Sequence, residues 1–289
     1  MFLMSYFRTE AEALHLALSP NGTQWHPLNE NKPVFKSSIG AASIRDPFVF
    51  QDRNGLFHLL STNGWNATAI YHALSDDLIT WRQESLIPVM ESVPGTRNCW
   101  APEAFYEAES DGYRIIWSST TPGSSGENDG HGYNHRIWSV STLDFRQFSQ
   151  PELFFDPGYG CIDACVASHN GKGYLMAFKD ERGDNSPDTP HKAIRIATAP
   201  VARGPWTIRE TFVSPALTEG PALFHKGQEL LLLFDHFTQD FFGAVASPDG
   251  ENWHDISHQI LMPPQPRHAS VIEIDDAIAQ KLEAYWEAN

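Results

Sequence analysis

A turn-rich segment that ends in an aromatic residue recurs five times along the 289 residues of the chain. The copies are SPNGTQW, SDDLITW, STLDFRQF, PVARGPW and SPDGENW, which end at Trp25, Trp81, Phe148, Trp206 and Trp253. A repeat of this length built from short strands is typical of a β-propeller, in which each four-stranded blade needs its neighbours to bury both faces. The sequence therefore predicts an all-β fold, a five-bladed β-propeller.

A second repeated element carries acidic residues. Four short strands begin near an acid and are followed by a glycine turn and an apolar second strand. They are IRDPFVF with Asp46, WAPEAFY with Glu103, CIDACVA with Asp163 and TEGPALF with Glu219. The acids are 57, 60 and 56 residues apart. We expect them at equivalent positions on the innermost strands of four blades, so that they converge at one end of the central axis.

The fifth blade is divided between the two ends of the chain. Residues 4–33 contain outer strands and the first repeat turn, whereas residues 266–274 (PRHASVIEI) form an inner strand without outer partners. Joining the N-terminal and C-terminal strands closes the last blade and removes two open sheet edges. No linker interrupts the chain, so we expect residues 1–289 to form a single catalytic domain, with a short capping helix after Asp275.

Charge and composition exclude several classes of partner. Lys and Arg number 20 and Asp and Glu number 36, which gives a formal net charge of −16. Such an acidic chain repels phosphate backbones and anionic lipids, so we expect no nucleic-acid partner and no membrane association. The N-terminus shows no basic segment followed by an apolar stretch, so no signal peptide is visible and a cytoplasmic location is expected.

Clustered carboxylates without Cys or His ligand motifs favour glycoside hydrolysis. One carboxylic acid protonates the leaving oxygen, while a carboxylate activates water or attacks the sugar. A neighbouring negative charge would raise the pKa of the acid member and keep it protonated near neutral pH. The alternative for each acid is a structural role at a strand end, which is a weaker explanation for four acids in register.

The ordered set RDP, WAPE, CID, EGP and RHAS resembles glycoside hydrolase family 43, a family of inverting five-bladed propeller enzymes. The resemblance covers the whole chain, including the divided blade. It implies that Asp46 is the general base that activates water, that Asp163 orients the acid and raises its pKa, and that Glu219 is the general acid. Glu103 stands where many members carry Asp, which implies a contact to a sugar hydroxyl.

The segment RHAS suggests two further site residues. His268 resembles a histidine that faces the axial cavity in several family members and sometimes holds a calcium ion through waters. Ala269 stands where a glycine is common, which weakens this metal prediction. Arg267 is expected to support the charge of the acid cluster and contact the substrate. No cofactor is expected to be required, apart from a structural calcium ion in the axial cavity.

Four more residues are candidates for substrate binding. Trp100 lies three residues before Glu103, and Trp65 lies in the loop after the second strand of the first blade, so either could stack on a sugar ring. His236 and Lys179 follow or end second strands in later blades and could reach sugar hydroxyls. Packing between blades, a loop histidine and an ion-paired lysine are the structural alternatives.

The resemblance leaves the sugar open. The partner is expected to be an oligosaccharide or polysaccharide, as in hemicellulose degradation. Family β-xylosidases often carry a further β-sandwich, for which the sequence has no room, so an α-L-arabinofuranosidase that releases terminal L-arabinofuranose is favoured. A β-xylosidase, an exo-β-1,3-galactanase and a non-catalytic carbohydrate-binding propeller are the alternatives.

Overall fold

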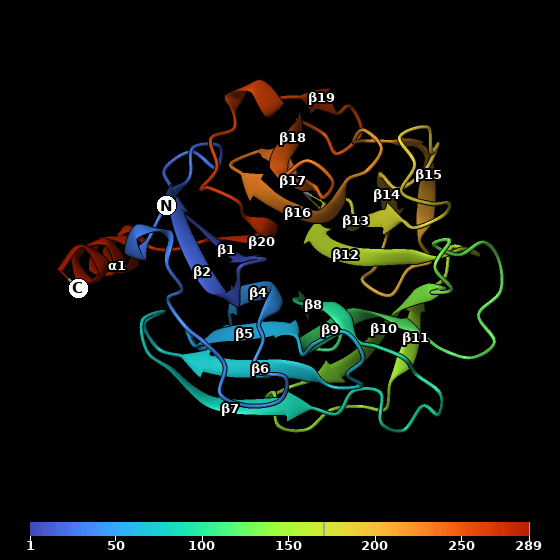
Figure 1. Ribbon diagram of the computed structural model, residues 1–289, viewed down its shortest axis with the longest axis horizontal. Helices are drawn as coiled ribbons and strands as arrows, with labels where there is room; N and C mark the ends of the chain where they lie inside the picture. Colours follow the sequence, from blue (N-terminus) through green and yellow to red (C-terminus); the bar gives the residue numbers. More distant parts are fainter. Residues whose placement is uncertain (170, 289) are drawn as a thin grey trace.

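The computed structural model describes residues 1–169 and 171–288. This part of the chain forms five four-stranded antiparallel sheets arranged around a common centre (Figure 1). The first strand of each sheet lies innermost and contacts the innermost strands of both neighbouring sheets, so the ring is closed. The predicted five-bladed β-propeller is confirmed.

Four blades are built from consecutive strands, ordered from the centre outward. Blade 1 contains β4 (Arg45–Gln51), β5 (Phe57–Thr62), β6 (Ile70–Ser75) and β7 (Trp81–Ile87). Blade 2 contains β8 (Trp100–Glu107), β9 (Gly112–Thr120), β10 (His135–Thr142) and β11 (Glu152–Phe155). Blade 3 contains β12 (Cys161–Ser168), β13 (Tyr174–Asp180), β14 (Ile194–Ala199) and β15 (Thr207–Phe212). Blade 4 contains β16 (Glu219–Lys226), β17 (Glu229–His236), β18 (Phe241–Ser247) and β19 (His254–Asp255).

Blade 5 joins the two ends of the chain, as the sequence predicts. Its strands are β20 (Arg267–Glu273), β1 (Phe2–Arg8), β2 (Ala11–Ser19) and β3 (His26–Pro27). Strand β20 is innermost and pairs antiparallel with β1, with Ser270 opposite Ser5. Figure 1 shows β1 and β20 side by side near the start of the chain. This pairing gives β1 a hydrogen-bonded neighbour on both edges and gives β20 an outer partner.

The expected C-terminal helix is present as α1 (Asp276–Ala288). Leu282 and Ala279 are its buried residues, and Trp286 packs against the apolar core of blades 1 and 5, whereas Tyr285 is 40% exposed. Two short 3-10 helices, η1 (Asn29–Asn31) and η2 (Ser257–Gln259), lie in loops. In the described residues, no helix is both long and apolar enough to cross a membrane.

In four of the five blades, the repeated turn is closed by the same hydrogen bond from a backbone N–H to a side-chain hydroxyl. A hydroxyl near its start accepts the backbone N–H three residues later, which fixes the tight turn before the aromatic residue. These bonds join Ser19 to Gly22, Ser75 to Leu78, Thr142 to Phe145 and Ser247 to Gly250. The blade 3 copy, PVARGPW, has no such hydroxyl, and the Gly204 N–H bonds the Val201 carbonyl instead.

The apolar core lies between neighbouring blades. Phe2 and Met4 on β1, for example, pack with Leu231 and Leu233 on β17 and with Phe224 on β16. Each buried side chain of this size contributes about 1.5–3 kcal/mol to stability. The blades therefore hold one another in place, which fixes where the innermost strands meet.

Candidate active site

A β-bulge near the start of each innermost strand turns one residue of every blade toward the axis. In blades 1 to 4, two residues of the inner strand stand where the second strand has one, and the first of the two has a positive φ. The equivalent β20 residue also has a positive φ. The five equivalent residues are Asp46 (φ 48°), Ala101 (φ 48°), Asp163 (φ 56°), Gly220 (φ 55°) and His268 (φ 43°).

This register corrects the expected equivalence of the four acids. Asp46 and Asp163 do occupy the same position in their blades. Glu219, however, precedes its blade's bulge by one residue, and Glu103 lies two residues beyond the position held by Ala101. The four carboxylates therefore enter the axial region at three different levels.

Asp46 lies beside His268 at the mouth of the axis. Its Oδ2 accepts a hydrogen bond from the Thr62 hydroxyl at 2.6 Å, and its Oδ1 lies 3.5 Å from Nδ1 of His268. Its side chain is 15% exposed, so water can reach the carboxylate. A partly exposed carboxylate held by one hydroxyl is suited to accepting a proton from water.

Asp163 approaches the same imidazole from another blade. Its Oδ2 lies 4.0 Å from Nδ1 of His268 and accepts the backbone N–H of Gly220 at 3.1 Å. Burial raises the pKa of Asp163 to about 7; the cation at His268 opposes this change, and the charge of Glu219 adds to it. Asp163 is therefore a carboxyl group that holds a proton close to neutral pH.

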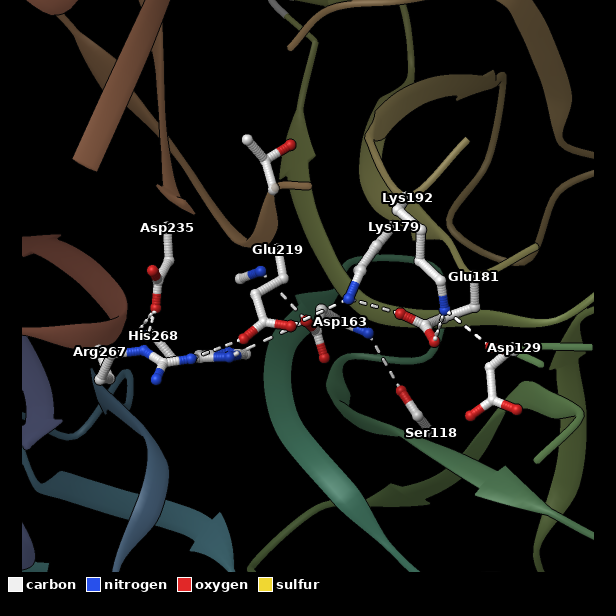
Figure 2. Close-up of polar contacts among 12 residues, drawn as sticks. Ser118, Asp129, Asp163, Lys179, Glu181, Lys192, Glu219, Asp235, Arg267 and His268 are labelled. Atoms are coloured by element: carbon white, nitrogen blue, oxygen red, sulfur yellow. Dashed lines mark hydrogen bonds and ion pairs between the residues drawn. The ribbon is translucent and has the colours of Figure 1, made fainter. Parts of the chain in front are cut away.

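Glu219 is bonded to two cations, one on each oxygen. Nζ of Lys179 lies 2.9 Å from Oε2, and Nη2 of Arg267 lies 2.9 Å from Oε1 (Figure 2). Burial favours the neutral form, but the ammonium of Lys179 and the guanidinium of Arg267 outweigh it, and the pKa of Glu219 lies below its usual value. The expected elevation of the acid's pKa is thus found at Asp163 and not at Glu219.

Glu103 lies one layer deeper than these groups. It occupies the position that Cys165 holds in the next blade, and its side chain contacts that thiol. Glu103 is only 7% exposed, and burial raises its pKa to about 8. The side chain is therefore a buried, neutral carboxylic acid one layer below Asp46 and Asp163.

Trp65 and Trp100 form an aromatic wall on one side of the mouth. The Trp100 indole N–H donates to the Trp65 backbone carbonyl at 2.9 Å, and the two rings meet edge to face. The guanidinium of Arg45 lies 4.6 Å from the Trp65 ring, and Tyr133 packs against Trp100. Trp65 is 57% exposed. The wall can offer an aromatic surface to a sugar.

His236 and Arg267 lie on the side of the site formed by blades 4 and 5. His236 stacks on Phe241, with ring centroids 4.0 Å apart, and is largely buried. A hollow of about 340 Å³ opens beside Arg267, and its other lining residues are Thr9, Glu10, Asp240 and Gln265. Arg267 therefore contacts both Glu219 and an open, polar space.

Lys179 differs from its predicted setting. It is only 3% exposed, and its ammonium group is bonded to Glu219 and Glu181. Lys179 is therefore an ion-paired lysine, which was the structural alternative to substrate binding.

The residues at the axis do not fit a calcium ion at His268. Nδ1 of His268 faces the carboxylates of Asp46 and Asp163. Burial opposes its protonation, but these anions outweigh burial and raise the pKa of His268, which favours the imidazolium form. Among the described residues, no group of three or more His, Cys, Asp or Glu side chains is arranged to hold a metal. We therefore derive no step from a metal at this position.

Three buried charged residues near the site were missed by sequence analysis. Asp235 is fully buried, its Oδ2 accepts the Arg267 Nε–H at 2.6 Å, and its pKa is raised by burial to about 6. Glu181 and Lys192 lie beyond Lys179, 3.1 Å apart. Asp235 could have been found from the sequence, because it lies opposite Glu219 in the predicted hairpin. Glu181 and Lys192 lie in a polar loop sequence, which does not indicate burial.

The arrangement meets the chemical needs of glycoside hydrolysis. Asp46 is an accessible carboxylate, and Asp163 and Glu219 lie on neighbouring blades, where the charge of Glu219 helps Asp163 to keep its proton. The fold and site thus define a propeller with acidic groups gathered at its axial mouth. Residues 1–279 match a family described as "Probable glycosyl hydrolase domain", related to glycoside hydrolase family 43. The chain belongs to this family of glycosidases.

Individual relatives are distant. An α-L-arabinofuranosidase of Bifidobacterium longum subsp. longum is 24% identical over 205 residues, which are 62% of this chain and 19% of that protein. The chain thus spans about a fifth of that relative. The α-L-arabinofuranosidase structure from Lactobacillus brevis has a TM-score of 0.58 at 15% identity and covers 74% of this chain and 72% of its own. A thermostable family-43 glycoside hydrolase has a TM-score of 0.60 at 14% identity, with 78% of each chain covered. These structural likenesses show the fold.

Proposed function

We propose that the protein is an inverting glycoside hydrolase that releases terminal L-arabinofuranose from oligosaccharides or polysaccharides. The observation that carries the proposal is the convergence of Asp46, Asp163 and Glu219, from three blades, around His268 and Arg267 at one end of the axis. Family membership supports glycoside hydrolysis, and the distant likeness to an α-L-arabinofuranosidase supports the choice of sugar.

In the proposed reaction, Asp46 removes a proton from water as the water oxygen bonds to the anomeric carbon. Glu219 delivers a proton to the leaving oxygen as the bond between that oxygen and the anomeric carbon breaks. Asp163 is the modulator of Glu219: the two carboxyl groups are close enough to influence each other's ionisation. Trp65, Trp100, Glu103, His236 and Arg267 are the proposed substrate-binding residues.

A panel of aryl glycosides tests this proposal. The enzyme should release nitrophenol from the α-L-arabinofuranoside faster than from the β-xyloside or β-galactoside, and NMR of the first product should show inverted anomeric configuration. Faster turnover of a xyloside, or of a β-1,3-galactan, would replace the arabinose assignment. Sugar binding without turnover of any glycoside would identify a non-catalytic carbohydrate-binding propeller.

A further inference from the structure

Lys179 departs from a pattern that three of the other four blades share; the fourth, blade 5, has Phe7 at this position. On the second strands of blades 1, 2 and 4, the residue opposite the start of the bulge has a side-chain oxygen. This oxygen accepts the N–H of the axial residue in the next blade. The three bonds run from Ala101 to Thr62, from Asp163 to Ser118 and from His268 to Asp235.

Blade 3 has a lysine at this position, opposite Ile162. An ammonium group has no lone pair and cannot accept a hydrogen bond. The Gly220 N–H of the next blade bonds Oδ2 of Asp163 instead. The contact between blades 3 and 4 at this level therefore does not depend on a bond to Lys179, whose ammonium contacts carboxylates instead.

The Lys179 ammonium is shared between two carboxylates. Nζ lies 2.9 Å from Oε2 of Glu219 and 2.5 Å from Oε1 of Glu181, and the ring of Phe237 lies 4.3 Å away. Glu181 in turn accepts a bond from Lys192 at 3.1 Å. Figure 2 shows Lys192, Glu181, Lys179 and Glu219 in one row of alternating charge.

This row is costly for a scaffold. Glu181 is 6% exposed and Lys192 2%, and each buried ion loses several kcal/mol of hydration that its partners must replace. Lys192 also donates to the backbone carbonyl of Asp129 at 3.2 Å, which ties the row to the loop between β9 and β10. The other end of the row is Glu219, so the charges are directed at the site.

We propose that Lys179 is a positioning residue for the reaction: its ammonium, shared in the resting site between Glu181 and Glu219, holds Glu219 ionised, and Glu219 gains its proton only when the ammonium leaves it and contacts Glu181 alone. This inference rests on the proposed function of Glu219 as the general acid. While Lys179 is bonded to Glu219, the proton shared by the two carboxyl groups resides on Asp163.

The proton balance of this step is simple. When the Lys179 ammonium leaves Glu219, the O–H bond at Asp163 breaks and one forms at Glu219. That second O–H bond breaks as the leaving oxygen takes the proton, while Asp46 takes a proton from the attacking water. Asp46 then releases its proton to solvent, and Asp163 takes one up from solvent, which restores the resting charges.

Lys179 and Arg267 each contact Glu219 and a second carboxylate, which is Glu181 for Lys179 and Asp235 for Arg267. Arg267 also bonds Glu219, but its Nε is bonded to the buried Asp235 at 2.6 Å. The charged and titratable groups that face the Glu219–Asp163 pair are Lys179, Arg267, His268, Asp46, Glu103 and Asp235, with Glu181 and Lys192 behind Lys179.

Two variants should have opposite effects on the alkaline limb of the kcat/KM profile, which reports loss of the general acid's proton. Lys179→Met removes a cation from Glu219, so the limb should move to higher pH by about one unit. Glu181→Gln removes the competing negative charge, so Glu219 is then the one carboxylate that Lys179 contacts. The limb should then move to lower pH, and kcat should fall about tenfold or more on poor leaving groups. Lys179→Arg, which keeps the charge, should largely retain the wild-type limb.

A second readout does not depend on activity. In protein labelled with ¹³C at Asp and Glu carboxyl carbons, Glu219→Gln and Asp163→Asn assign the two resonances. Asp163 should titrate near neutral pH and Glu219 well below it, and Lys179→Met should move Glu219 upward. A wild-type Glu219 that titrates near neutral pH, or that is unmoved by Lys179→Met, overturns the inference.

The two failures are distinguishable. If the wild type hydrolyses no glycoside, the proposed function fails, while the carboxyl titration still decides the role of Lys179. Thermal unfolding shows whether each variant folds. If Lys179→Met does not fold, the shift of the alkaline limb in Glu181→Gln still tests the inference. A purely structural role predicts loss of stability in both variants without opposite pH shifts, and that result also overturns the inference.

Discussion

Nδ1 of His268 lies 3.5 Å from Oδ1 of Asp46, which joins the last inner strand of the propeller to the first. The two residues occupy the same bulge position in neighbouring blades, so closure of blade 5 by β1 and β20 brings them together. The imidazole also lies 4.0 Å from Asp163. Pairing of the chain ends thus completes the site as well as the ring.

Removal of the proposed acid should affect poor leaving groups most. Glu219→Gln should lower kcat about 100-fold or more on oligosaccharides, because their leaving oxygen requires a proton. Activated aryl glycosides should be less affected. Glu210→Gln, on the exposed outer strand β15, is the matched control. Equal losses on both kinds of substrate would contradict the assignment.

Removal of the proposed base should affect every substrate. Asp46→Asn should lower kcat about 100-fold or more on aryl glycosides and oligosaccharides alike, since water must be activated in both reactions. Steady-state kinetics on the same two substrates measure the effect, and Asp255→Asn on the outer strand β19 serves as the control. Activity close to wild type on either substrate would rule out Asp46 as the base.

Glu103 should make stability fall as pH rises. Burial raises its pKa from 4.5 to about 8, so the native state keeps a proton that the unfolded chain loses in this range. The free energy of unfolding therefore decreases as the pH rises between these values. Glu103→Gln should gain stability over the wild type by about 1.4 kcal/mol per pH unit in this window.

Denaturant unfolding at pH 5 and pH 8 measures this gain. The two proteins should be similar at pH 5 and differ clearly at pH 8. Asp163 is present in both, so its own pH dependence cancels from the comparison. A constant difference at the two pH values would show that Glu103 is ionised in the folded protein.

The aromatic wall should act in binding more than in folding. Trp65→Ala keeps the backbone carbonyl that Trp100 bonds, so the free energy of unfolding should change little. KM for oligosaccharides should rise by about fivefold, as expected when about 1 kcal/mol of stacking is lost. Trp25→Ala is the structural counterpart: Trp25 is 1% exposed, and its loss should cost about 3–5 kcal/mol of stability. An unchanged KM in Trp65→Ala would exclude the stacking role.

The fold could be predicted from sequence because its signals are local and repeated. A Ser or Thr hydroxyl such as that of Ser75 closes the turn within three residues, and this hydroxyl-closed turn recurs in four of the five blades. The divided blade was also predictable, since residues 266–274 have the pattern of an inner strand and lack their own partners. Asp46, Asp163 and Glu219 could be selected because each opens such a strand.

The charge state of the site could not be predicted. A bulge adds one residue to one strand without any compositional signal, so the sequence could not show that Glu219 precedes the axial position held by Gly220. Glu181 and Lys192 stand in a polar loop stretch typical of exposed residues. Only the packing of that loop against the loop after β9 buries them beside Lys179.

The sequence alone determined the five blades, their closure by the two chain ends and the acidic strands at the axis, because turn chemistry and strand pattern act over a few residues. The tertiary structure decided which carboxyl group carries the proton. Ionisation depends on burial and on charges that neighbouring blades bring within about 4 Å, and those distances exist only once the ring has closed.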